Sequence, residues 1–125
     1  MKLLTHNLLM CNKKGCTINN YPLRIQATNI ITKPHELDID TLERMVKKVD
    51  WNGLVIGCKD INYPIQFNFE TLTEEQKKSK EFYQEMNKML YEVIIQDGML
   101  KCENCGREYP IVNGIANLSL KDEEL

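Results

Sequence analysis

The sequence predicts an α+β fold, in which both ends of the chain build a small metal-binding β domain and the middle forms an inserted helical lobe. Three observations support this prediction: a cysteine pair near each end, helical periodicity between the pairs, and a β-hairpin signal after the second pair. A length of 125 residues suits one domain with an insertion. We expect residues 1–34 and 98–125 to form the β domain, and residues 35–97 to form the lobe.

Four of the five cysteines carry the metal-binding hypothesis. Cys11 and Cys16 lie close together near the start of the chain, and Cys102 and Cys105 lie close together near its end. Four thiolates fill the tetrahedral shell of one zinc ion, and a filled shell leaves no position for water or substrate. The predicted β domain is therefore a zinc-binding domain, and we expect its single ion to be structural.

Other uses of these cysteines stay open. The thiols could be unrelated buried or free side chains. A redox Cys-x2-Cys motif would need a helix that begins at its first thiol, whereas hairpin residues follow Cys105. His6 and His35 are possible substitute ligands, and we expect Cys58 to be a small apolar residue inside the lobe.

The first half of the chain predicts short strands followed by a helix. Residues 2–10 suit one turn of helix or a strand, and residues 21–25 alternate apolar and polar side chains, as a strand does. Asp38 or Asp40 can then cap a helix by accepting hydrogen bonds from its first N–H groups. The apolar face of this helix would carry Ile39, Leu42, Met45, Val46 and Val49.

A second helix is expected after residue 73. Residues 52–53 (Asn-Gly) are expected to break the helical pattern, and residues 54–56 are apolar without a clear period. Thr73 and Gln76 have the spacing of a capping box, which predicts a helix start. Residues 97–98 (Asp-Gly) would end this helix. Its apolar face would carry Phe82, Met86, Met89, Leu90, Val93 and Ile94.

The C-terminal part predicts a β-hairpin with an apolar last strand. Residues 109–112 and 115–120 would be its strands, joined by the turn pair Asn113 and Gly114. The last strand has no charge before Lys121, and an uncharged apolar strand at a sheet edge needs a cover. Either it lies inside the sheet of this protein, or another chain adds a strand beside it.

Composition and motifs argue for binding rather than catalysis. The net charge of −2, from 16 basic and 18 acidic residues, gives no electrostatic footprint for nucleic acid. The sequence holds no glycine-rich phosphate loop and no nucleophile motif. No apolar stretch is long enough to cross a membrane, and Thr5, His6 and Asn7 interrupt the apolar start, so no signal peptide is expected. We therefore expect a reducing compartment, the cytoplasm and nucleus.

Three stretches resemble the small zinc-binding activator subunit that several eukaryotic S-adenosylmethionine-dependent methyltransferases share, the multifunctional methyltransferase subunit family. They are residues 4–11 (LTHNLLMC) with Cys16, residues 49–51 (VDW) and residues 98–118 (GMLKCENCGREYPIVNGIANL). The last stretch is the most specific, because it combines the metal knuckle, the Asn-Gly turn and the apolar strand. Family members usually have proline where Ala116 stands, and residues 35–97 match poorly outside the second stretch.

The resemblance implies a subunit that is not itself an enzyme. Family members bind methyltransferases that modify tRNA, rRNA and the translation termination factor, as heterodimers formed by strand pairing, and they cover an apolar surface on the enzyme. RNA or release factor would be contacted only through the complex. The alternative function is a zinc-ribbon RNA-binding module. By this resemblance, the expected metal ligands in this chain are Cys11, Cys16, Cys102 and Cys105. The expected partner surface is Ile115, Ala116, Asn117, Leu118, Ser119 and Leu120.

Overall fold

Four antiparallel strands form one sheet, in the order β1-β2-β3-β4, in the computed structural model of the chain. The structure describes residues 1–65, 67–68 and 71–118. The sheet and the helices that pack on it confirm the predicted α+β fold. The strands are β1 (Arg24–Thr32), β2 (Val93–Lys101), β3 (Glu108–Val112) and β4 (Ile115–Ala116). The helices are α1 (Leu3–Leu8), α2 (Ile39–Val46), α3 (Trp51–Asp60), the 3-10 turn η2 (Gln76–Lys78), α4 (Lys80–Asn87) and the π-helical turn η3 (Lys88–Glu92).

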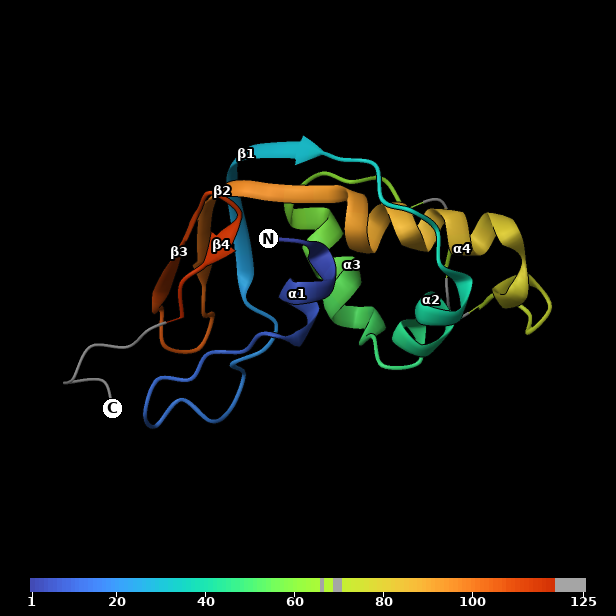
Figure 1. Cartoon of the computed structure of the whole chain (residues 1–125). Coiled ribbons are helices and arrows are strands. Elements are labelled where there is room, and N and C mark those ends of the chain that lie inside the picture. The colour runs from blue at the N-terminus through green and yellow to red at the C-terminus, as the bar shows by residue number, and fades with distance from the viewer. Residues whose placement is uncertain (66, 69–70, 119–125) are drawn as a thin grey trace.

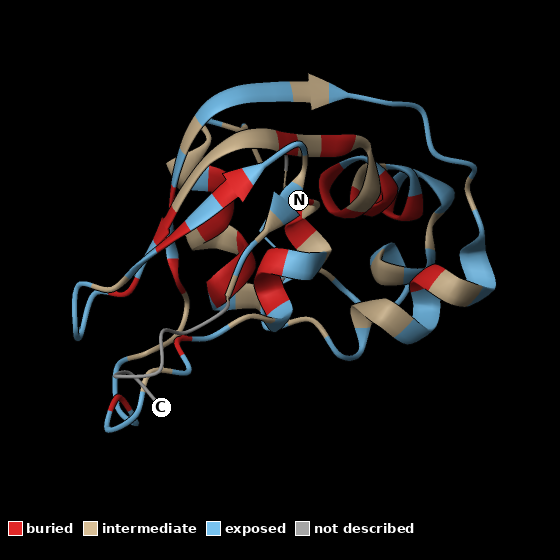
Figure 2. Ribbon diagram, turned by 60° about the vertical axis from the view of Figure 1, so that its left-hand side comes forward, coloured by how far each residue is buried: buried red, intermediate tan, exposed pale blue. Residues whose placement is uncertain are grey.

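The long strands β1 and β2 connect the two ends of the molecule. Figure 1 shows β3 and β4 at one end, α2 and α4 at the other, and α1 and α3 between them beside the β1–β2 ribbon. The buried residues, red in Figure 2, come mainly from α1, α3, α4 and the sheet, and they form one core cluster. The lobe boundary expected after residue 97 falls inside β2, which begins at Val93.

The first predicted helix is confirmed, and its cap is Asp38. The Asp38 side chain accepts a hydrogen bond from the Thr41 backbone N–H at 3.2 Å, and α2 runs from Ile39 to Val46. Leu42 is the fully buried residue of its apolar face. The strand predicted at residues 21–25 begins later, at Arg24, and continues to Thr32.

The expectation that residues 52–53 break the helical pattern is wrong, because both lie in α3. A Cβ at Gly53 would collide with the Tyr21 hydroxyl, so this glycine allows α3 to pack closely against the segment before β1. Asn7 fixes the start of the same helix: its side-chain amide donates to the Asp50 carbonyl at 2.8 Å and accepts from the Asp50 N–H at 2.9 Å. The Asn7 side chain is buried, and these two bonds pair its amide with the backbone at the start of α3.

The second predicted helix is shorter than expected at both ends. The reciprocal hydrogen bonds between Thr73 and Gln76 are present, but they close the turn that leads into η2. Ser79 caps α4 by accepting from the Phe82 N–H. Val93 and Ile94 lie in β2, not on the helix. Residues 93–95 are all β-branched, which favours a strand, and Gly98 is needed within β2 rather than at a helix end.

Gly98 pairs with Ala27 in the β1–β2 ladder, beside a register shift between Ala27 and Asn29. A Cβ at position 98 would lie against the Gln26 carbonyl oxygen and 3.0 Å from the Ala27 Cα, which are both backbone atoms. We therefore expect Gly98→Ala to lower the free energy of unfolding by about 1–3 kcal/mol, as overpacking does. Urea denaturation of the purified protein measures this change.

Gly15→Ala is the matched control for this substitution. Nothing lies within 4 Å of a Cβ at Gly15, so only its positive φ of 85° opposes the change. A left-handed backbone costs a non-glycine residue about 1–2 kcal/mol, without the need for the strands to move apart. If Gly98→Ala and the unmodified protein had the same free energy of unfolding, the backbone of β1 would not lie against residue 98.

Candidate metal centre and partner strand

The four predicted cysteine ligands come together at one point, between the first loop and the β2–β3 connection. The Sγ atoms of Cys11, Cys16, Cys102 and Cys105 all lie within 4.8 Å of one another. The Cys11–Cys105 and Cys16–Cys102 Sγ distances are both 3.6 Å. Metal–sulfur bonds of about 2.3 Å in a tetrahedron place sulfurs about 3.8 Å apart. The cluster therefore has the size of a tetrahedral four-thiolate site and could hold a metal ion.

Two tight turns present these thiols. The Cys16 N–H donates to the Lys13 carbonyl at 3.0 Å, which closes the first turn. The Gly106 N–H donates to the Cys102 carbonyl at 2.9 Å, and Gly106 has a φ of 74° that favours glycine. Asn20 joins the first pair, because its amide donates to the carbonyls of Cys11 and Cys16, both at 3.1 Å.

Hydrogen bonds around the sulfurs favour one ionised thiol. The Tyr109 hydroxyl lies 3.1 Å from Cys11 Sγ, and the Asn104 amide donates to Cys16 Sγ at 3.3 Å. Burial raises the pKa of Cys11, but the bonds from Tyr109 and other neighbours outweigh it and lower this pKa to about 7. The Asn104 amide lowers the pKa of Cys16, yet burial and the other thiols raise it to about 12. A cation is needed before all four groups ionise together.

An ion network links this cluster to the helices. The Arg24 guanidinium lies 2.8 Å from a carboxylate oxygen of Glu103, which stands between the two cysteines of the second pair. The same guanidinium forms a two-pronged pair with Asp60 at the end of α3, at 2.5 Å for the closest contact. Asp60 also accepts from the Ile25 N–H at 2.9 Å. The carboxylate thereby covers one backbone group on the outer edge of β1.

The remaining thiol and the histidines lie outside the cluster. Cys58 is fully buried in α3, as expected, and burial raises its pKa to about 11. His6 is buried too: its Nε2 lies 2.6 Å from the Leu23 carbonyl oxygen, and burial lowers its pKa. His35 stacks on Tyr91 with ring centroids 4.4 Å apart. Within the described part of the chain, the four cysteines are the one grouping of three or more metal-binding side chains.

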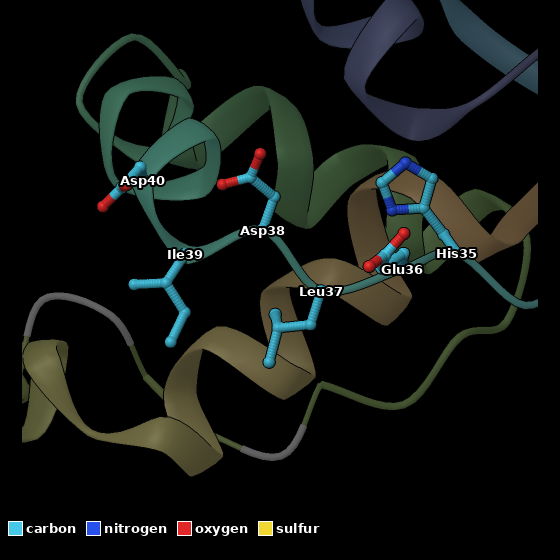
Figure 3. A pocket seen from close by; sticks show the side chains of 6 residues that line it. All are labelled: His35, Glu36, Leu37, Asp38, Ile39 and Asp40. Carbon is cyan, nitrogen blue, oxygen red and sulfur yellow. The ribbon is translucent and has the colours of Figure 1, made fainter.

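A surface hollow of 540 Å³ lies on the lobe and is lined by residues 35–40 (Figure 3). Its carboxylates come from Glu36, Asp38 and Asp40. The Asp38 carboxylate is engaged in capping α2, since it accepts from both the backbone N–H and the hydroxyl of Thr41. These bonds hold the pKa of Asp38 below its ordinary value. In this acidic segment, the Asp38 carboxylate is therefore the N-terminal cap of α2.

The candidate partner strand is the last strand of the described sheet. In β4, Ala116 pairs with Ile111 and Ile115 pairs with Val112, and the Asn117 N–H donates to the Pro110 carbonyl at 2.9 Å. The described strand is shorter than predicted, because Asn117 and Leu118 follow it without a strand conformation. Ser119 and Leu120 lie outside the described residues.

The side chains of this strand divide between the core and the surface. Ala116 and Leu118 are partly buried and pack against the core. Ile115 points outward and is 70% exposed, beside Val112, which is 57% exposed. A hollow of 570 Å³ lies beside this hairpin and is lined also by β2 (Ile94 and Gln96) and by the N-terminal segment (Met1, Lys2, Thr5 and Leu9). The surface available to a partner therefore centres on Ile115 and Val112.

Sequence reasoning missed Val112, and it did not single out two apolar side chains near the N-terminus, Leu8 at the end of α1 and Met10 just after it. Leu8 and Met10 are exposed. Val112 was assigned only to the hairpin, and period-2 alternation does not say which face of an edge strand is covered. The apolar run of residues 8–10 before Cys11 was the available signal for the other two, since the metal cluster fixes that segment at the surface.

None of the helices described here is long and apolar enough to span a membrane.

Comparison with known proteins places the chain in a family. A sequence model of the Trm112p-like protein family matches residues 2–114. The multifunctional methyltransferase subunit TRM112-like protein of Bos taurus is 38% identical over 124 residues, covering 99% of this chain and 98% of the relative. Homolog A of multifunctional methyltransferase subunit TRM112 from Arabidopsis thaliana is 34% identical over 131 residues, covering 100% of both chains.

A solved structure shares the fold. A chain of the E. cuniculi Mtq2–Trm112 complex, responsible for methylation of the eRF1 translation termination factor, superimposes with a TM-score of 0.55. The match covers 94% of each chain at 19% sequence identity. The family match, the two full-length relatives and the shared fold agree with the resemblance carried by the cysteine pairs and the hairpin. The chain therefore belongs to the Trm112p-like protein family.

Proposed function

We propose that this protein is a non-catalytic activating and stabilising subunit of S-adenosylmethionine-dependent methyltransferases, which it binds as a heterodimer. The observation that carries the proposal is the family match over residues 2–114, together with relatives that are named methyltransferase subunits over their full lengths. The fold neighbour belongs to a complex that methylates a translation termination factor. We propose methyltransferases of tRNA, rRNA and the termination factor as partners, with these substrates contacted only through the complex.

The mode of attachment that we propose is strand pairing at β4. An edge strand leaves backbone N–H and C=O groups without a neighbour. Ile115 of β4 and its cross-strand neighbour Val112 of β3 are both exposed. The proposed surface comprises residues 115–120, of which residues 119–120 lie outside the described part. The enzyme would cover these apolar side chains, and an edge strand of its own sheet would pair with β4.

We propose zinc as the metal and a structural role for it. Zinc favours four cysteine thiolates in a tetrahedron, and the sulfur separations fit that shell. The ion would join the N-terminal segment to the β2–β3 connection, so that the two ends of the chain form one domain. Four reduced thiols require a reducing compartment, so we propose the cytoplasm and nucleus. The alternative of a zinc-ribbon RNA-binding module lacks support from the net charge of −2 and from the relatives.

Affinity purification from the native cell tests the proposed function. The protein should co-purify with one or more methyltransferases, identified by mass spectrometry, in a ratio of one to one. The complex should survive ribonuclease treatment, because the contact is between proteins. Recovery of RNA and no methyltransferase would contradict the proposal and favour the RNA-binding alternative.

Tyr109→Phe is expected to weaken zinc retention without unfolding the protein. Tyr109 is fully buried, and its one hydroxyl hydrogen can go to Cys11 Sγ at 3.1 Å or to the Asn12 amide oxygen at 3.2 Å. A thiolate is the charged acceptor of the two, so ionised Cys11 attracts this hydrogen. Loss of such a supporting hydrogen bond typically costs about 10–100-fold in metal affinity. Competition with a chromogenic zinc chelator measures the change.

Tyr63→Phe is the matched control for this effect. It deletes the same atom from a hydroxyl that donates to Glu85 at 3.1 Å, away from the cysteine cluster. We expect Tyr63→Phe to retain zinc as the unmodified chain does. Equal zinc retention in both variants would show that the Tyr109 hydroxyl does not support the thiolate.

A further inference from the structure

The outer edge of β1 is open over its second half. β1 is an edge strand of the sheet, and no described helix or strand lies on its outer side near the arrowhead in Figure 1 or Figure 2. Asp60 accepts from the Ile25 N–H at 2.9 Å and so covers only the start of this edge. Residues 25–32 (IQATNIIT) carry no charge and include no proline. A long uncharged edge strand is a template for pairing with another chain.

Two residues of this open half turn their backbone groups away from β2. In an antiparallel ladder, pairs that exchange hydrogen bonds alternate with pairs that do not. The Ile95 N–H of β2 donates to the Met1 carbonyl at 2.8 Å, so Ile95 exchanges no bonds with its β1 partner, Ile30. The register is unshifted from Ile30 to Thr32, so both residues direct N–H and C=O outward. Among the described residues, none bonds to these outward groups.

A second copy of the chain matches the spacing of these groups. A two-fold axis at Ile31 places Ile30 of each copy opposite Thr32 of the other. Each of these two pairs exchanges two N–H···O bonds, so four backbone bonds form and both residues are satisfied. The pairing stops there, because Pro34, the next residue on this side, has no N–H.

Charges around the same axis favour a second copy. The symmetry places Lys33 of one copy opposite Asn29 of the other, and the Asn29 amide lies 3.5 Å from the Asp97 carboxylate. Residues directly opposite share one face of a sheet, so Lys33 meets an opposite charge on that face. The two Lys33 side chains themselves are about 13 Å apart along the strands, beyond the screening length of about 10 Å.

We propose that the outer edge of β1 at residues 29–33 is a second strand-pairing surface, and that its partner is a second copy of this chain. The contact is the same on both copies, so it closes as a dimer and does not continue into a fibre. β1 and β4 are opposite edges of the sheet, so the dimer leaves β4 free for a methyltransferase. This last consequence rests on the proposed function, whereas the dimer itself does not.

Sedimentation equilibrium of the purified chain tests the dimer. Four backbone bonds predict a weak association, so the concentrations extend to about 1 mM. Ile30→Lys brings two like charges within about 7 Å along the strands, and we expect it to raise the Kd of the dimer at least about tenfold. Ile39→Lys is the matched control, since Ile39 in α2 is 42% exposed and Ile30 is 40% exposed. We expect this control to dimerise as the unmodified chain does.

Three results of this experiment would overturn the proposal. The unmodified chain could remain a monomer at every concentration, or it could form assemblies larger than a dimer. The dimer could also persist in Ile30→Lys and disappear in Ile115→Asp, which would assign it to β4 instead of β1.

Hydrogen exchange measured by NMR tests the pairing without any substitution. The outward N–H groups of Ile30 and Thr32 are open to water in the monomer, and both should exchange at least about threefold more slowly at high protein concentration. The Ile25 N–H, which Asp60 already holds, should be unaffected by concentration. Exchange of Ile30 and Thr32 that does not depend on concentration would overturn the proposal, even if Ile30→Lys failed to fold. Because the chain is measured alone, the result does not depend on whether a methyltransferase binds.

Discussion

Cys102→Ser is expected to abolish zinc binding and to remove the cooperative unfolding transition of the protein. Cys102 is buried, and its Sγ lies 3.6 Å from that of Cys16, so a serine oxygen would leave the shell with three thiolates. Structural zinc in small domains contributes roughly 10–16 kcal/mol, comparable with the total of about 5–15 kcal/mol that holds a typical domain folded. Loss of the ion therefore removes most of the stability of the part that joins both ends of the chain.

Zinc analysis and thermal unfolding measure this prediction together. The unmodified chain should bind one zinc ion per molecule, and Cys102→Ser close to none. Cys58→Ala is the matched control, because Cys58 is an equally buried thiol outside the cluster. We expect it to keep its zinc and to lose about 1 kcal/mol of stability from the small cavity. Full zinc content and unchanged unfolding of Cys102→Ser would contradict the metal account.

Ile115→Asp is expected to break the complex with the methyltransferase while the chain itself stays folded and zinc-bound. Ile115 is 70% exposed, so a carboxylate there remains in water in the free subunit. In the complex the same carboxylate would be buried against an apolar surface without a counter-charge. Loss of a central interface residue costs about 2 kcal/mol or more, and we expect Kd to rise at least about 30-fold. Titration calorimetry with the purified methyltransferase gives the Kd.

The choice of Ile115 follows from the structure. Leu118 belongs to the same predicted surface, but it packs partly against the core, so an aspartate there would also disturb the fold of the free subunit. Ile39→Asp is the matched control: Ile39 is exposed as well and lies in α2, at the end of the molecule away from β4 (Figure 1). Tight binding by Ile115→Asp would show that β4 is not the attachment site.

The sequence was sufficient to predict features that depend on local chemistry. The cysteine pairs predicted the cluster because a tetrahedral ion requires four thiolates, whatever lies between them. The hairpin turn followed from Asn113 and Gly114, which have φ values of 52° and 80°. The cap at Asp38 followed from a side chain that can accept from the next N–H groups.

Features that depend on distant contacts were not predictable in this way. Gly53 looked like a helix breaker, and only the Tyr21 ring that packs on it explains a glycine inside α3. The apolar period of α4 continues without interruption into Val93 and Ile94, so nothing local marks the change from helix to strand. That change is set by pairing with β1, more than sixty residues away in the sequence, and by the reciprocal bonds between Met1 and Ile95.

Methyl transfer by a reconstituted complex tests the central claim most directly. The co-purifying methyltransferase is assayed with radiolabelled S-adenosylmethionine and its substrate in four mixtures: alone, with this chain, with Ile115→Asp, and with this chain in place of the enzyme. We predict a rate at least about tenfold higher with the chain than without it, no such increase with Ile115→Asp, and no transfer by the chain itself. An equal rate for the enzyme alone and for the mixture, or transfer by the chain in the absence of enzyme, would contradict the account.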